Sequence, residues 1–231
     1  MHQPVAGSRL RWREPWRCGA YAGGVRSRYP RLLARHGENV ANLSRTFSHR
    51  VFDGDLTARG RDQAHALGRR LVAAGPRFNF VAVSPLRRAI QTAEIISGYV
   101  GVPIGLELDD LREINVGDLD GKNDPESWRI YQATLAGWLR GELDHRFPGG
   151  ENGHELVARL RRALGRVANT AGPGPALVVG HGANLRAALP ALTATPDPGE
   201  DLRTVGTAQL DVILAAPEAV AIRLLSWGQP L

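Results

Sequence analysis

Four polar segments of the sequence come directly after stretches that read as strands, and they carry residue types suited to handling phosphate. The segments are Arg35-His36-Gly37-Glu38, Ser84-Pro85-Leu86-Arg87-Arg88-Ala89, Leu111-Arg112-Glu113 and Gly180-His181-Gly182. Ligands of open α/β sheets bind outside the carboxyl ends of the strands, so two histidines, at least two arginines and one carboxylate are expected to converge. Neighbouring arginines keep a histidine neutral and available as a nucleophile, and guanidinium groups match phosphate oxygens. The pattern suits phosphoryl transfer through a phosphohistidine.

The elements that must position these residues alternate between strand and helix from Pro30 onward, which predicts one α/β domain. Strands are expected at 31–35, 78–83, 103–108, 176–179, 204–215 and 219–226, the last two forming a pair. Helices are expected at 57–74, 84–100, 124–143, 151–171 and 182–192. Thr57 is the expected N-cap of the 57–74 helix, and Ser84 followed by Pro85 reads as the start of the 84–100 helix.

Composition favours an ordinary globular protein: 231 residues, 43% hydrophobic and 23% charged. The single cysteine, Cys18, can form no internal bridge, which argues against a disulfide scaffold and against a cysteine-based metal cage. No segment approaches the roughly 20 apolar residues of a membrane span. With no secretory signal in the sequence either, we expect a cytoplasmic protein without a membrane partner.

The net charge of +6 comes from one end of the chain. Residues 1–31 hold seven arginines and one acid, and the basic and acidic residues of the rest are equal in number. The body therefore has no net field to attract nucleic acid. We expect residues 1–30 to be a basic, disordered N-terminal extension and residues 31–231 to be the catalytic domain. A targeting peptide, or a weak polyanion-binding arm supported by Trp12 and Trp16, are alternative interpretations of the extension.

Several motifs in the same order resemble the histidine phosphatase superfamily, also called phosphoglycerate-mutase-like. Arg35-His36-Gly37-Glu38 with Asn42 resembles its RHG signature, and the similarity extends over about residues 31–227. It continues through the segments listed here: Leu56-Thr57 to Gly60, Gln63-Ala64, Ser84 to Ala89, Thr92-Ala93, Leu111 to Glu113, and Gly180 to Arg186. The resemblance implies a three-layer α/β/α sandwich with a mostly parallel central sheet.

The resemblance also implies a role for each matching residue. His36 is expected to be the nucleophile, Arg35 and Arg88 to bind phosphate, and His181 to contact the transferring phosphoryl group. Glu113 is expected to protonate the leaving oxygen, and Asn42 and Gly182 to contribute to substrate binding. Arg87 is expected to point elsewhere. No metal or other cofactor is implied, because the arginines and His181 supply the charge that other phosphoryl-transfer enzymes take from magnesium.

The family contains phosphatases and mutases, and this sequence favours a phosphatase. Glycolytic mutases typically follow the acid with Arg-x-Tyr, whereas here Glu113 is followed by Ile114, Asn115 and Val116. A cofactor-dependent mutase and a non-catalytic module that binds a phosphate ligand are the alternatives.

The substrate is expected to be a small phosphomonoester, roofed by residues 43–54 and 115–147. Aromatic and cationic residues are mixed in these segments, so either an apolar body or an extra carboxylate would fit. The oligomeric state is open, and the last two strands offer an edge for a homodimer.

Overall fold

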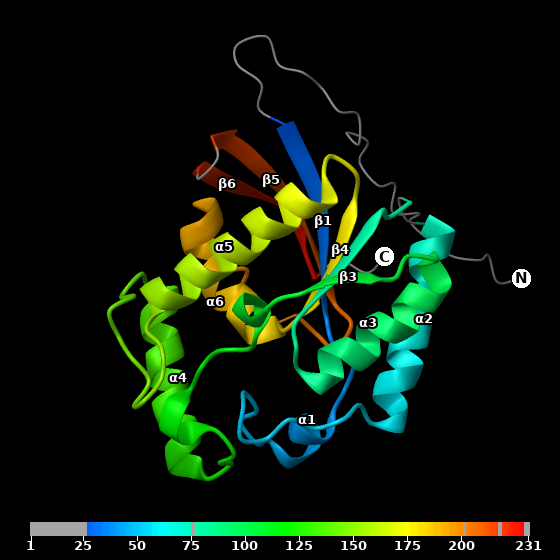
Figure 1. Cartoon of the computed structure of the whole chain (residues 1–231). Helices are drawn as coiled ribbons and strands as arrows, with labels where there is room; N and C mark the ends of the chain where they lie inside the picture. The colour runs from blue at the N-terminus through cyan, green and yellow to red at the C-terminus, as the bar shows by residue number, and fades with distance from the viewer. Residues whose placement is uncertain (1–26, 75–76, 201, 217–218, 229–231) are drawn as a thin grey trace, which may run out of the picture.

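A six-stranded mixed sheet forms the centre of the protein (Figure 1). The computed structural model describes residues 27–74, 77–200, 202–216 and 219–228. The strands are β1 (Ser27–Arg35), β2 (Phe80–Val83), β3 (Ile104–Glu107), β4 (Ala176–Gly180), β5 (Thr207–Ala216) and β6 (Ala219–Trp227). Their order is β3-β2-β4-β1-β5-β6; β1 to β4 are mutually parallel, and β5 runs antiparallel to both β1 and β6.

Strand β1 starts earlier than the sequence predicts. Residues 27–30, which the sequence predicts to be part of the disordered extension, pair with Asp211 to Leu214 of β5. That part of the prediction is wrong because β5 supplies an antiparallel partner far away in the sequence. Residues 1–26, the rest of the predicted extension, lie outside the described residues.

Helices cover both faces of the sheet, which confirms the three-layer arrangement (Figure 1). The α-helices are α1 (Val40–Ser44), α2 (Ala58–Ala74), α3 (Arg87–Val100), α4 (Pro125–Leu139), α5 (Gly153–Ala171) and α6 (Gly182–Thr193), with short 3₁₀ turns at Asp109–Leu111 and Gly117–Leu119. Alternate residues of the central strands face opposite layers. Leu32 and Ala34 pack towards α2 and α3, and Leu33 packs towards α5 and α6.

The predicted N-cap is confirmed for helix α2 and wrong for helix α3. Thr57 Oγ1 accepts the Gly60 N–H at 3.0 Å, as expected for the cap of α2. Helix α3, in contrast, begins at Arg87 with Leu86 as N-cap, so the prediction that Ser84 caps it is wrong. The Ser84 hydroxyl instead bonds to His181 across the sheet.

The five-residue helix α1 was not predicted. Asn39 caps it, and the Asn39 and Asn42 side chains each accept the other's backbone N–H. Figure 1 shows α1 and α4 at the same end of the molecule. Within the described residues, no helix is both long and apolar enough to cross a membrane.

Candidate active site

The predicted site residues gather at one pocket of about 180 Å³. Its lining combines the end of β1, helix α1 and the loop after it, the first turn of α3, the loop around Glu113, and α4. The lining residues are Arg35, His36, Asn39, Ala41, Asn42, Thr46, Phe47, Ser48, Arg88, Glu113, Ile114, Val116, Trp128, Tyr131 and Ala183. Of the predicted residues, Arg35, His36, Asn42, Arg88 and Glu113 line the pocket itself.

The loop that carries His36 is held tightly against its neighbours. A Cβ on Gly37 would lie 2.3 Å from the Gly60 carbonyl oxygen, and one on Gly60 would lie 1.9 Å from the Glu38 carbonyl oxygen. Two motif side chains bind the same loop, because Thr92 Oγ1 accepts the Gly37 N–H and Gln63 Oε1 accepts the Glu38 N–H. These motif residues therefore support the loop's backbone.

His36 is held in one tautomer by two partners whose roles are fixed. Its Nδ1 lies 2.7 Å from the carbonyl oxygen of Gly37, which can only accept a hydrogen bond. Its Nε2 lies 3.1 Å from Nε of Arg88, which can only donate. The proton of a neutral His36 is therefore on Nδ1, and Nε2 presents a lone pair.

Electrostatics reinforce the neutral state. His36 is 3% exposed, and burial lowers its pKa well below the usual value, with the charges of Arg88 and Arg35 acting in the same direction. The same order of causes, burial first and then Arg88, lowers the pKa of the fully buried His181.

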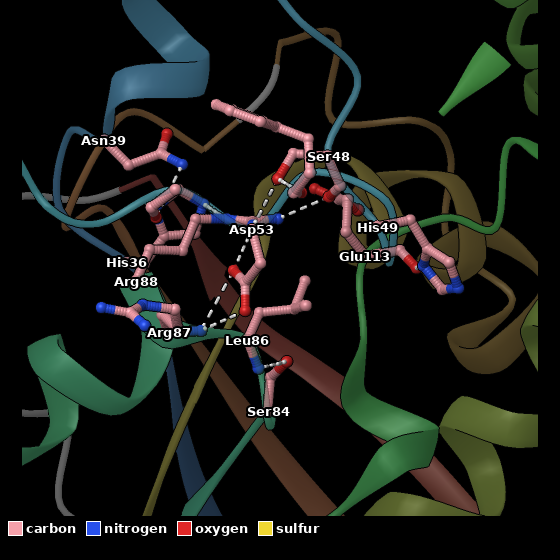
Figure 2. A network of polar contacts seen from close by, with 12 residues as sticks. His36, Asn39, Ser48, His49, Asp53, Ser84, Leu86, Arg87, Arg88 and Glu113 are labelled. Atoms are coloured by element: carbon pink, nitrogen blue, oxygen red, sulfur yellow. Dashed lines mark hydrogen bonds and ion pairs between the residues drawn. The ribbon is translucent and has the colours of Figure 1, made fainter. Parts of the chain in front are cut away.

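Arg88 is clamped from several sides, and Figure 2 shows it between His36 and Ser48. Its Nη1 donates to Ser48 Oγ at 2.9 Å and its Nη2 to the Ser48 carbonyl at 3.0 Å. Asp53 lies 3.5 Å from Nη1. Burial lowers the pKa of Arg88 to about 10, so it remains a cation at neutral pH. The adjacent Arg87 is exposed and pairs with Asp55 instead.

His181 lies behind His36, with ring centroids 5.2 Å apart. Its Nε2 is 2.7 Å from Ser84 Oγ, and Ser84 Oγ also accepts the Leu86 N–H at 3.4 Å. Within the described part of the chain, the buried His181 Nδ1 has no hydrogen-bond partner. Buried polar atoms are normally paired, so an unpaired nitrogen at this position is unusual. His181 itself does not line the pocket of about 180 Å³; it lies directly behind His36, which does.

Arg35 and Gly182 meet at the start of α6. Arg35 donates from Nη1 to the Leu202 carbonyl at 2.5 Å, while its buried Nε lacks a partner among the described residues. A Cβ on Gly182 would lie 3.0 Å from Cδ and 3.3 Å from Nε of Arg35. The structure thus places Gly182 against Arg35 and puts Ala183 in the pocket wall.

Glu113 is fixed through both its side chain and its backbone. Its Oε1 accepts N–H groups from Ile114 at 3.0 Å and Asn184 at 2.8 Å. Its carbonyl accepts from His49 Nδ1 at 3.0 Å and Arg159 Nη2 at 3.1 Å. Asn184 is in the first turn of α6, so a backbone N–H at the start of this helix donates a hydrogen bond to the Glu113 carboxylate.

Asn42 is an exposed residue of the pocket lining, in the first turn of α1. Its Oδ1 accepts the Asn39 N–H at 3.1 Å, so the residue also stabilises the start of the helix on which it sits.

Several residues that hold the site side chains in place were not predicted from the sequence. Ser48 and Asp53 contact Arg88, His49 and Arg159 contact the Glu113 carbonyl, and Ser84 bonds to His181. No local pattern marks the Ser48, Asp53 or Arg159 contacts, because their partners are distant in the chain. Within the described ranges, no group of three or more His, Cys, Asp or Glu residues is arranged to hold a metal ion.

Comparisons with known proteins show the family to which the chain belongs. Residues 32–228 match the histidine phosphatase superfamily (branch 1). The chain is 38% identical over 186 residues to a 2,3-bisphosphoglycerate-dependent phosphoglycerate mutase of Methylobacterium sp. (strain 4-46), covering 75% of this chain and 86% of the relative. It is 35% identical over 158 residues to the uncharacterized phosphatase PhoE of Bacillus subtilis (strain 168), covering 68% and 74%.

A solved structure shows the same fold. The native structure of a mycobacterial glucosyl-3-phosphoglycerate phosphatase superposes with a TM-score of 0.69 at 24% identity, covering 88% of this chain and all of that one. The relatives thus include both mutases and phosphatases. On the family match and these identities, the chain belongs to the histidine phosphatase superfamily.

Proposed function

We propose that this protein is a phosphomonoester hydrolase that works through a phosphohistidine on His36 and needs no metal. The observation that carries the proposal is the state of His36: a buried, neutral imidazole whose Nε2 lone pair meets a guanidinium inside the pocket. A cation next to a nucleophilic nitrogen holds that nitrogen unprotonated and can also bind the phosphoryl oxygens that approach it.

The first step forms a bond from His36 Nε2 to phosphorus and breaks the bond from phosphorus to the ester oxygen. As the bond forms, the hydrogen bond that Arg88 Nε–H donates changes its acceptor from the Nε2 lone pair to a phosphoryl oxygen. The unpaired Nε–H of Arg35 donates to a second phosphoryl oxygen. We assign the Ser84 hydroxyl as the hydrogen-bond donor to His181 Nε2, so that the proton of neutral His181 is on Nδ1 and this N–H is a further donor. Throughout, His36 Nδ1–H keeps its bond to the Gly37 carbonyl.

Glu113 supplies the proton for the departing alcohol. Its Oε1 is held by two backbone N–H groups, so we place the transferable proton on Oε2. Once the alcohol has left, the carboxylate takes a proton from water as the water oxygen bonds to phosphorus. The bond from phosphorus to Nε2 then breaks, its electron pair returns to His36, and phosphate is released.

A mutase is the second candidate, and the observation in its favour is the name of the Methylobacterium relative. Hydrolysis is preferred because Ile114 and Val116, which follow Glu113 in place of the Arg-x-Tyr of glycolytic mutases, form an apolar wall of the pocket. This wall offers no charge to a carboxylate.

The test is phosphate release from a panel of phosphomonoesters in the presence of a chelator. Wild type is compared with His36→Ala and with His154→Ala, an exposed histidine whose partner is Asp144. We expect turnover in wild type and His154→Ala and none in His36→Ala, with acid-labile phosphate trapped on His36 alone. Turnover that survives His36→Ala would refute the mechanism, and conversion of 3-phosphoglycerate to its 2-isomer without phosphate release would favour the mutase.

A further inference from the structure

The charges of the pocket wall bear on the part of the substrate beyond its phosphate. Among the described residues that line the pocket, the only cations are Arg35 and Arg88, and both contact or adjoin His36. Both therefore lie where the phosphoryl group would bind. A second anionic group on the substrate would have to pair elsewhere on the wall.

The arginines of the roofing segments do not serve that purpose. Four of them pair with carboxylates outside the pocket: Arg50 with Asp109, Arg129 with Glu126, Arg140 with Glu142, and Arg146 with Glu155. Arg45 lies over the Trp128 ring at 5.1 Å from its centroid. The alternative left open by the sequence, a substrate with an extra carboxylate, thus finds no cation besides Arg35 and Arg88 among the described residues of the pocket wall.

Aromatic rings occupy the wall instead. The rings of Phe47 and Trp128 lie 4.5 Å apart between centroids, those of Phe47 and Tyr131 5.0 Å, and those of Trp128 and Tyr131 5.5 Å. Ile114 and Val116 extend the apolar surface. The indole N–H of Trp128 donates to the Arg45 carbonyl at 3.0 Å, so this donor is already paired within the protein, and Trp128 contributes apolar surface to the pocket lining.

The polar side chains of the wall already bond within the protein. Thr46 Oγ1 lies 2.7 Å from Ser44 Oγ, Ser48 Oγ donates to the Phe52 carbonyl at 2.6 Å, and Asn42 Oδ1 accepts from Asn39. A substrate rich in hydroxyl groups would have to compete with these bonds.

We infer that the site selects phosphomonoesters of uncharged alcohols that carry an aromatic or similarly flat apolar group, and rejects phosphates that bear a carboxylate or a second phosphate. The inference rests on the proposed function, since it takes this pocket as a phosphomonoester site. Burying an unpaired carboxylate against the aromatic wall would cost more than the contact gains.

Binding of non-hydrolysable phosphonates tests this selectivity without turnover. Calorimetry compares benzylphosphonate with 4-(phosphonomethyl)benzoate, which adds one carboxylate to the same body, and with propylphosphonate, which lacks the ring. We expect benzylphosphonate to bind about tenfold more tightly than either. Equal or tighter binding of the carboxylated compound, equal binding of propylphosphonate, or no binding of benzylphosphonate would each overturn the inference.

Variants of the wall sharpen the result. Trp128→Ala should weaken the binding of benzylphosphonate about tenfold and leave the binding of inorganic phosphate unchanged. Trp128→Phe should restore most of the lost affinity for benzylphosphonate. Thr46→Arg should tighten the binding of 4-(phosphonomethyl)benzoate about tenfold, because it supplies a cation for the carboxylate. The uncharged Thr46→Gln should not tighten it. If phosphonate selectivity holds but no ester is hydrolysed, the proposed function fails and the inferred selectivity stands.

Discussion

The Nε–H of Arg88 donates a hydrogen bond to Nε2 of His36 at 3.1 Å, and this contact joins the proposed phosphate-binding arginine to the proposed nucleophile (Figure 2). Ser48 holds the other end of the guanidinium through both its hydroxyl and its carbonyl. The planar fork of arginine can make all three bonds at once, which the point charge of lysine cannot.

Replacing Arg88 with lysine should therefore reduce activity although the charge is kept. We expect kcat/KM to fall by about 100-fold or more, the usual cost of removing one donor to developing negative charge. Arg87→Lys is the matched control, because Arg87 is the preceding residue but pairs with Asp55 at the surface. Its kcat/KM should stay within about twofold of wild type. Equal losses in the two variants would contradict the assignment.

The tautomer of His36 can be observed directly. With ¹⁵N-labelled histidine, the ring of His36 should show a proton on Nδ1 and a bare Nε2, and should remain neutral at pH 6, below the usual histidine pKa of about 6.5. His36→Asn assigns the signal by removing it. A His36 ring that titrates near pH 6.5 would show that burial and Arg88 do not suppress protonation.

The lowered pKa values of His36, His49 and His181 predict how stability changes with pH. Between the usual pKa of about 6.5 and the lower folded values, the unfolded chain binds more protons than the folded one. The free energy of unfolding is therefore at its full value above pH 6.5 and decreases as the pH falls below it, by at most about 1.4 kcal/mol per pH unit for each histidine.

Urea denaturation at pH 7.5, 6.5 and 5.5 measures this dependence. His36→Asn removes one of the three groups and should flatten the slope below pH 6.5. A free energy of unfolding that rises as the solution is acidified would contradict the direction of these shifts.

Arg159 is expected to act on catalysis through Glu113. Its guanidinium donates to the carbonyls of Asp110, Arg112 and Glu113 and forms a buried pair with Glu151, so it fixes the loop that aims the proposed acid. Arg159→Lys should lower kcat on phenyl phosphate, whose leaving group needs a proton, by about tenfold or more. The same variant should lose much less on p-nitrophenyl phosphate, whose more acidic phenol leaves without help.

Arg162→Lys serves as the control for Arg159. Arg162 lies on the same helix and reaches the same loop, but it is exposed and its ion pair within the described residues is with the Asp110 side chain. It should leave both rates close to wild type. If Arg159→Lys lowered kcat equally on both substrates, the role of Arg159 would be in general stability and not in positioning Glu113.

The contact between Gly60 and the loop of His36 predicts a cost in stability. Gly60→Ala would push a Cβ to 1.9 Å from the Glu38 carbonyl oxygen, and backbone atoms cannot rotate away. We expect a loss of about 1–3 kcal/mol in the free energy of unfolding. Gly98→Ala, in α3 with nothing within 4 Å of its Cβ, should instead stabilise by up to about 1 kcal/mol. Comparable effects of the two substitutions in urea denaturation would contradict this account.

The sequence by itself determined the α/β class, the positions of all six strands and of every helix except α1 and the short 3₁₀ turns to within a few residues, and five of the residues that line the pocket. It could do so because periodic apolar residues fix the elements, and the parallel strands then bring Arg35, His36, Arg88 and Glu113 to one edge of the sheet. Local rules failed where a distant partner competed with a neighbour. Ser84 bonds to His181 and does not cap α3, and residues 27–30 join the sheet because β5 pairs with them.

Only the tertiary structure decided how the site residues are held and what surrounds them. The clamp of Ser48 and Asp53 on Arg88 and the bond from Arg159 to the Glu113 carbonyl join segments 35 to 46 residues apart in the chain. The ion-pair partners of the arginines in the roofing segments could not be predicted from the sequence either, because a long arginine side chain pairs with whichever carboxylate folding brings within reach. Residue types and their spacing give the chemistry of this site, whereas the pairing of its charges depends on contacts that exist only once the chain has folded.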